Sequence, residues 1–160
     1  MTSATTNETQ IIVDPDVPIV RIVREFDAPP EKVFRAHADP ELLVRWLGPH
    51  ELEMRIDHHD CRTGGSYRYV HSGGGEDYGF FGSFHEVRAP ELIVQTFTFE
   101  GFPDGVTLER LVLEDLGGGR TRLTGSSLFA SFEERQAMLV SGMEVGVDEG
   151  YEKLDALLAE

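Results

Sequence analysis

The feature that most restricts the fold of this chain is a series of strand-like segments, separated by glycine and proline clusters and followed by one long helical segment. From residue 50 onward, Leu52, Met54 and Ile56 alternate with charged neighbours, which is the period of a strand with one buried face. Further strand-like runs occupy 66–71, 77–87, 91–100, 106–115 and 120–129. The clusters between them, SGGGE, RAPE, GFPDG and LGGGR, are typical of hairpin turns. The pattern predicts an antiparallel meander.

The C-terminal segment has a helical period. Ser131 followed by Glu134 is a capping-box pattern, after which one apolar stripe recurs at helical spacing. The stripe contains Val140, Met143, Val147, Tyr151, Leu154 and Leu158. We predict one amphipathic helix of roughly 27 residues, about 40 Å long. A stripe of that length needs a partner surface, and the concave face of the sheet is the one available.

The N-terminal third predicts one more strand and two short helices. VPIVRIVREF (17–26) is rich in β-branched residues and is stopped by DAPPE. EKVFRAHA predicts one helix, and DPELLVRWL predicts a second with Asp39 as N-cap and Pro40 at its first position. Residues 1–16 are polar and predict a flexible arm. We therefore expect a single domain over 17–160, an α+β fold with a curved antiparallel sheet around a long C-terminal helix.

Several segments, taken in order, resemble one known superfamily. They are FDAPPEKVFRAHADPELLVRWLGP, DCRTGGSYR, GSFHEVRAPELIVQTF, GGGRTRLT and GYEKLDALL. Over residues 17–158 the chain resembles the START-like SRPBCC superfamily, and within it the branch of the activator of heat-shock-protein-90 ATPase. The resemblance implies a helix-grip fold, like that of the birch-pollen allergen, with a cavity between sheet and long helix. It also implies several functions, from lipid carriers and hormone receptors to polyketide cyclases.

Composition excludes several classes of partner. The 160 residues carry 14 Lys and Arg against 29 Asp and Glu, a formal net charge of −15, so the chain should repel nucleic acids and anionic membranes. We find no apolar run long enough to span a membrane and no export signal, and the single Cys61 fits a reducing compartment. A cytoplasmic location is the expectation.

The run HHDC at 58–61 combines residue types that bind metals. On a strand, His58 and Asp60 would face one way while His59 and Cys61 face the other, so the four side chains diverge. No second Cys/His group lies at ligand spacing, and we expect no metal site. His58 is expected to continue the inward face of Met54 and Ile56, either as a hydrogen-bonded histidine or as a polar group of a pocket.

Glu109 and Arg110 lie in the middle of the strand VTLERLVLE. Whichever of them points inward places a charge beneath the long helix, where burial is costly without a partner. If Thr107, Glu109 and Leu111 face inward, Glu109 is a proton donor or acceptor with a raised pKa. The sequence leaves the choice of face open.

Three functions remain after these exclusions. The first is binding of a small hydrophobic or amphipathic molecule, without a cofactor. The second is a cyclase, dehydratase or hydrolase that uses His58 or Glu109 as general acid or base. The third, suggested by the family resemblance and the acidic surface, is a co-chaperone that activates a heat-shock ATPase. We also expect that a homodimer can form where an edge strand or the arm at residues 1–16 is left unpaired. The residues expected to contact a ligand are Trp46, Met54, His58, Tyr69, Phe81, Phe97, Glu109, Met143 and Val147.

Overall fold

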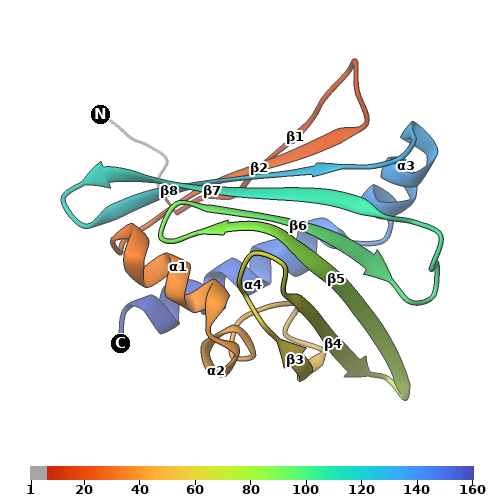
Figure 1. Ribbon diagram of the computed structural model, residues 1–160, viewed down its shortest axis with the longest axis horizontal. Coiled ribbons are helices and arrows are strands. Elements are labelled where there is room, and N and C mark those ends of the chain that lie inside the picture. The colour runs from red at the N-terminus through yellow and green to blue at the C-terminus, as the bar shows by residue number, and fades with distance from the viewer. Residues whose placement is uncertain (1–6) are drawn as a thin grey trace.

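The computed structural model describes residues 7–160 as one curved antiparallel sheet covered on its concave face by helices (Figure 1). The sheet order is β1-β2-β8-β7-β6-β5-β4-β3. The strands are β1 (Gln10–Val13), β2 (Ile19–Phe26), β3 (Glu53–His59), β4 (Ser66–Gly73), β5 (Glu76–Arg88), β6 (Leu92–Phe99), β7 (Thr107–Gly117) and β8 (Arg120–Leu128). The predicted α+β helix-grip arrangement is confirmed, because the meander and its closing helix occupy the expected places.

The first two helices lie at one end of the sheet. Helix α1 (Pro30–Ala38) and the short helix α2 (Pro40–Leu43) lie beside the C-terminal part of the last helix in Figure 1. Asp39 caps α2 as predicted, since its side chain accepts a hydrogen bond from the backbone N–H of Glu41 at 3.0 Å. Trp46 follows in the turn after α2, where its indole N–H donates to the carbonyl of Ala36 at 2.9 Å.

The predicted single C-terminal helix of about 27 residues is wrong, because the segment forms two helices. Helix α3 (Phe132–Val140) is capped by Ser131, whose side chain accepts from the N–H of Glu134, as the capping-box pattern predicts. Helix α4 (Met143–Leu158) begins after Gly142, which has a φ of 92°. A left-handed residue cannot belong to a right-handed helix, and glycine adopts that conformation without steric cost. The predicted stripe is interrupted at this break: Val140 at the end of α3 is 72 % exposed, whereas the other members of the stripe lie on α4.

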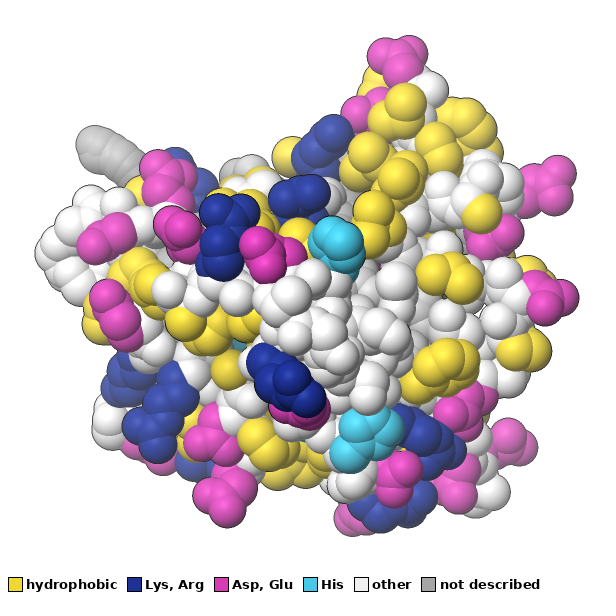
Figure 2. Space-filling model, viewed as in Figure 1, with side chains coloured by type: hydrophobic (Ala, Val, Ile, Leu, Met, Phe, Trp, Pro, Cys, Tyr) yellow, Lys and Arg dark blue, Asp and Glu magenta, His cyan; other side chains and the backbone are white. Residues whose placement is uncertain are grey.

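Part of the predicted flexible arm also differs from the expectation. Residues 10–13 form β1 and pair with residues 20–23 of β2, because the β-branched run Ile11–Val13 can extend the sheet by one edge strand. Residues 1–6 of the predicted arm lie outside the described residues. In Figure 2, apolar side chains gather over this β1–β2 hairpin, where Ile12, Val13 and Val17 are exposed.

The core lies beneath the C-terminal half of α4. Tyr151, Leu154, Leu157 and Leu158 are buried there against side chains of α1 and the sheet, including Phe26, Val33 and Leu123. Arg24 of β2 points into this core with 3 % of its side chain exposed, and its guanidinium donates to both carboxylate oxygens of Asp155 at 2.7 Å. This bidentate pair ties α4 to the sheet.

Candidate functional site

A cavity of about 330 Å³ lies between the concave face of the sheet and helix α4. Ligand pockets of proteins begin at about this size. The sheet supplies one wall, and Met143, Gly146, Val147 and Tyr151 of α4 supply the opposite wall. The turn after α2 closes one side with Trp46, Leu47 and Gly48. Most of the lining side chains are aliphatic or aromatic, so an occupant would meet largely apolar walls.

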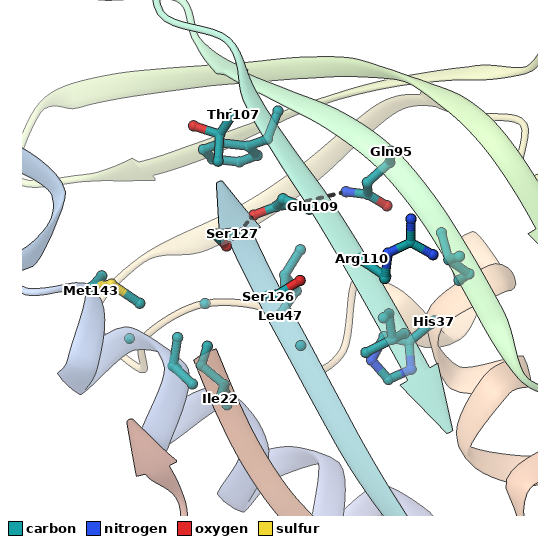
Figure 3. Close-up of a pocket in the computed structure, with 18 of the residues that line it drawn as sticks. Ile22, His37, Leu47, Gln95, Thr107, Glu109, Arg110, Ser126, Ser127 and Met143 are labelled. Carbon is teal, nitrogen blue, oxygen red and sulfur yellow. Dashed lines mark hydrogen bonds between the residues drawn. The ribbon is translucent and has the colours of Figure 1, made fainter. Parts of the chain in front are cut away.

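One carboxylate lies on the sheet wall of this cavity. The register pairs Glu109 of β7 with Gln95 of β6 on one side and with Ser127 of β8 on the other. Figure 3 shows the Glu109 side chain between these two neighbours. Its Oε1 accepts from Nε2 of Gln95 at 3.1 Å, and its Oε2 accepts from the Ser127 hydroxyl at 3.4 Å. Thr107, Glu109 and Leu111 share the inward face, while Arg110 is exposed, which settles the choice that the sequence left open.

Three tyrosines lie near this carboxylate. Tyr67 donates to the carbonyl of Thr96 at 2.6 Å and accepts from Gln95 at 3.2 Å, so it belongs to the hydrogen-bonded group of Glu109. Tyr69 of β4 and Tyr151 of α4 also line the cavity. Neither of their hydroxyls has a hydrogen-bond partner among the atoms of residues 7–160. These two hydroxyls remain available to water or to a ligand.

Burial shifts the pKa values of Glu109 and of the tyrosines near it. Burial raises the pKa of Glu109 from 4.5 to about 7, although the hydrogen bonds from Gln95 and Ser127 favour the carboxylate and oppose that rise. Burial and the nearby Glu109 charge also raise the pKa values of Tyr67 and Tyr69. Near neutral pH, therefore, the tyrosines are uncharged while Glu109 exchanges readily between its two forms.

Two histidines form a second polar part of the lining. His37 Nδ1 lies 2.8 Å from the carbonyl of Val33, and His59 Nε2 lies 3.1 Å from the carbonyl of His37. A carbonyl only accepts, so each of these ring nitrogens must carry the proton. Burial lowers the pKa of His37 to about 4 and also lowers that of His59. Both rings are neutral at pH 7.

Most residues predicted to contact a ligand line this cavity. They are Trp46, Tyr69, Phe97, Glu109, Met143 and Val147. Met54 points inward from β3 but packs against the hydrophobic core, away from the cavity. Phe81 lies on the outer face of β5 and is 40 % exposed, whereas its neighbour Phe80 stacks on Tyr69 and Phe97. Sequence reasoning chose the wrong member of this aromatic pair.

The prediction that His58 points inward is wrong. Ile56 pairs with Tyr69, and the next pair joins His58 to Arg68, so Asp57 is an extra residue that forms a bulge. A bulge reverses the alternation of side chains beyond it. His58 is exposed and bonds the Ser66 hydroxyl at 3.0 Å, while His59 takes the inward position and packs against Phe84. His58 therefore has no place in a reaction inside the cavity.

Tyr67, Gln95, Ser127, His37 and His59 are cavity residues that sequence reasoning did not select. Strand alternation would have found Tyr67 and Gln95, because they share a face with Tyr69 and Phe97. Ser127 needed the register of β7 with β8. His37 and His59 required the packing of α1 against β3, which no local pattern of the sequence indicates.

The HHDC run does not assemble into a metal site. Within residues 7–160 no group of three or more His, Cys, Asp or Glu side chains is arranged to hold a metal ion. Burial raises the pKa of Cys61 to about 11, so its thiol stays protonated and is a poor nucleophile.

None of the helices within residues 7–160 is long and apolar enough to cross a membrane.

Comparisons with known proteins agree on one family. The family model described as activator of Hsp90 ATPase homolog 1-like protein matches residues 27–159. No curated protein matches the chain. Three solved structures share its fold with a TM-score of 0.85: proteins from Arthrobacter aurescens, Rhodobacter sphaeroides and Mycobacterium smegmatis.

These three relatives are similar along their whole length. The Arthrobacter protein is 33% identical, and the match covers 94% of this chain and 91% of that one. The Rhodobacter protein is 30% identical over 95% and 99% of the two chains, and the Mycobacterium protein is 29% identical over 94% and 96%. Because the family model spans most of the chain and the fold agrees, this protein belongs to the family of activator of Hsp90 ATPase homolog 1-like proteins.

Proposed function

We propose that this protein binds a small, mainly apolar molecule in the cavity beneath α4, with one polar group of that molecule directed at Glu109. The observation that carries the proposal is the cavity itself, about 330 Å³ with largely apolar walls and one hydrogen-bonded cluster on the sheet. Apolar walls supply affinity, and a few fixed polar groups orient the ligand. The single Cys61 and the acidic surface fit a cytoplasmic role.

The test is to fill the cavity. Met143 lines it from the first turn of α4, so Met143→Trp should occupy the space that a ligand needs. Val145→Trp is the matched control, because Val145 is exposed on the same helix. The neutral fluorescent probe N-phenyl-1-naphthylamine reports uptake, and circular dichroism reports folding.

We expect Met143→Trp to remain folded and to lose probe binding by about tenfold or more, because the indole replaces the bound molecule. Val145→Trp should bind as the wild type does. Unchanged uptake in folded Met143→Trp would contradict binding in this cavity. Native mass spectrometry of protein purified from its own cell would then identify any natural ligand as an added mass that is lost on denaturation.

A second function, acid–base catalysis in the same cavity, is favoured by one observation. Glu109 is partly desolvated and has a pKa of about 7, which suits proton transfer at neutral pH. Catalysis by Glu109 would give a pH–rate profile with an inflection near pH 7, and Glu109→Gln would abolish it.

A co-chaperone role rests on the family description alone, and enrichment of a chaperone over a charge-matched control in a pull-down would support it.

A further inference from the structure

The charges and rings around the cavity select among ligands, and this selection rests on the proposed binding function. Among the lining residues, Glu109 is the one acid, and the histidines are neutral. Arg110 of β7 also borders the cavity, but it is exposed and strand alternation directs its side chain to the face opposite that of Glu109. A ligand in this cavity thus meets one potential negative charge, while the buried Arg24 lies outside the lining and is paired with Asp155.

The walls next to this carboxylate are aromatic. Tyr67 and Tyr69 stack with ring centroids 6.0 Å apart, and Tyr69 continues through Phe80 to Phe97 in a ladder of stacked rings. Tyr151 faces the sheet from α4, with Trp46 stacked behind it at 6.1 Å. Because these rings cover one another's faces, the wall offers the ligand apolar contact area, and Glu109 is the group that can hold a charge.

We propose that the preferred ligand is a hydrophobic organic amine, bound as the ammonium with its charge at Glu109 and its apolar body along the aromatic wall. The cost of removing the Glu109 carboxyl from water is already incurred on folding. An ammonium that enters supplies the missing counter-charge, and the unpaired hydroxyls of Tyr69 and Tyr151 supply acceptor oxygens for its remaining N–H groups. A carboxylate ligand, by contrast, would place a second negative charge beside Glu109.

Three probes with the same apolar body test this preference: 4-phenylbutylamine, 4-phenylbutan-1-ol and 4-phenylbutanoate. Trp46 is the only tryptophan of the chain and lines the cavity, so its fluorescence reports occupancy. Calorimetry provides an independent Kd. At pH 8 we expect the Kd of the amine to be lower than that of the alcohol by about tenfold or more, because a charge-assisted hydrogen bond is stronger than a neutral one. The carboxylate should bind most weakly.

The pH dependence adds a second readout. The titratable groups facing Glu109 are Tyr67 and Tyr69 from β4 and Tyr151 from α4, and burial raises the pKa of each further above neutrality. The neighbouring Gln95 and Ser127 do not titrate. Because the free Glu109 must lose its proton to pair with an ammonium, amine binding should weaken about tenfold from pH 8 to pH 6. Binding of the uncharged alcohol should change little.

Two variants assign the effect to a residue. Glu109→Gln should bring the Kd values of amine and alcohol close together and remove the pH dependence. Glu114→Gln changes an exposed glutamate on the outer face of the same strand and should keep the wild-type order. An amine that binds no better than the alcohol overturns the proposed preference but leaves binding in the cavity intact. Absence of binding by all three probes overturns both proposals. The comparison of the three probes on the wild-type protein tests the preference for an amine even if a variant fails to fold.

Discussion

The two ends of the helical cover are packed differently, although the sequence predicts one apolar stripe along both. At the C-terminal end, Leu154, Leu157 and Leu158 of α4 are buried in the core, and the Arg24–Asp155 pair fixes the helix to β2. At the other end no side chain within residues 132–140 is buried, and Met143 and Val147 face the cavity. One end of the stripe therefore stabilises the fold, while the other leaves room for a ligand.

The largest expected effect comes from truncating the packed end. Leu154 has 0 % of its side chain exposed, so Leu154→Ala should lower the free energy of unfolding by about 3 kcal/mol through lost burial and the cavity left behind. Val145→Ala, at a site on the open half of the same helix that is 58 % exposed, should change it by less than about 0.5 kcal/mol. Urea unfolding measures both. Equal effects would contradict the division of the helix into two ends.

The carboxylate on the sheet wall predicts an unusual dependence of stability on pH. The pKa of Glu109 is about 7 in the folded protein and 4.5 when the side chain is exposed to water, as in the unfolded chain. Between pH 4.5 and pH 7 the folded state therefore binds more protons than the unfolded state. The contribution of Glu109 to stability is therefore complete below pH 4.5 and is lost as the pH rises through about 7, a change of about 3 kcal/mol.

His37 has the opposite trend, since its pKa is lowered from 6.5 to about 4 and its contribution grows as the pH rises through that range. The measurement is therefore a difference: unfolding free energies of the wild type minus those of Glu109→Gln, from pH 4 to pH 8. The histidine contribution cancels in that difference. A difference that stays constant with pH would show that Glu109 titrates at its ordinary pKa.

The smallest expected change in stability is that of alanine substitution at two glycines of α4, Gly146 and Gly150. A Cβ on Gly146 would lie 3.5 Å from Pro49, an ordinary contact, so Gly146→Ala should stabilise the protein by about 0.5–1 kcal/mol through helix propensity. A Cβ on Gly150 would lie 3.1 Å from the Trp46 carbonyl and 3.3 Å from the Gly48 nitrogen, so Gly150→Ala should destabilise it by about 1 kcal/mol. Thermal unfolding of the pair gives the signs. Two shifts of the same sign would refute the contrast.

Sequence reasoning recovered the meander, the first short helix and the capping position of Asp39, because alternation and capping are local signals, but the second helix ends at Leu43 rather than at Leu47. It placed the α4 part of the apolar stripe correctly but wrongly included the exposed Val140 and missed the break at Gly142, since a glycine in a helical pattern can be read either as a packing site or as a stop. The prediction that His58 points inward was wrong because one bulge residue, Asp57, reverses the alternation of side chains after it. The neighbours of Glu109 depend on the pairing of three strands, which local patterns do not specify.

The pairing of β2 with β8 has a consequence for how the chain is made and folded. Residues 19–26 pair with residues 121–128, so the first long strand cannot take its place beside β8 until about a hundred further residues have been synthesised. The hairpins from β3 to β7 can assemble earlier, because their contacts are local. Such a high contact order slows folding and prolongs the exposure of unpaired edges. Because α4 follows β8 along the chain, the sheet wall of the cavity can form before the helix that covers it, and the binding site is complete only once α4 has docked.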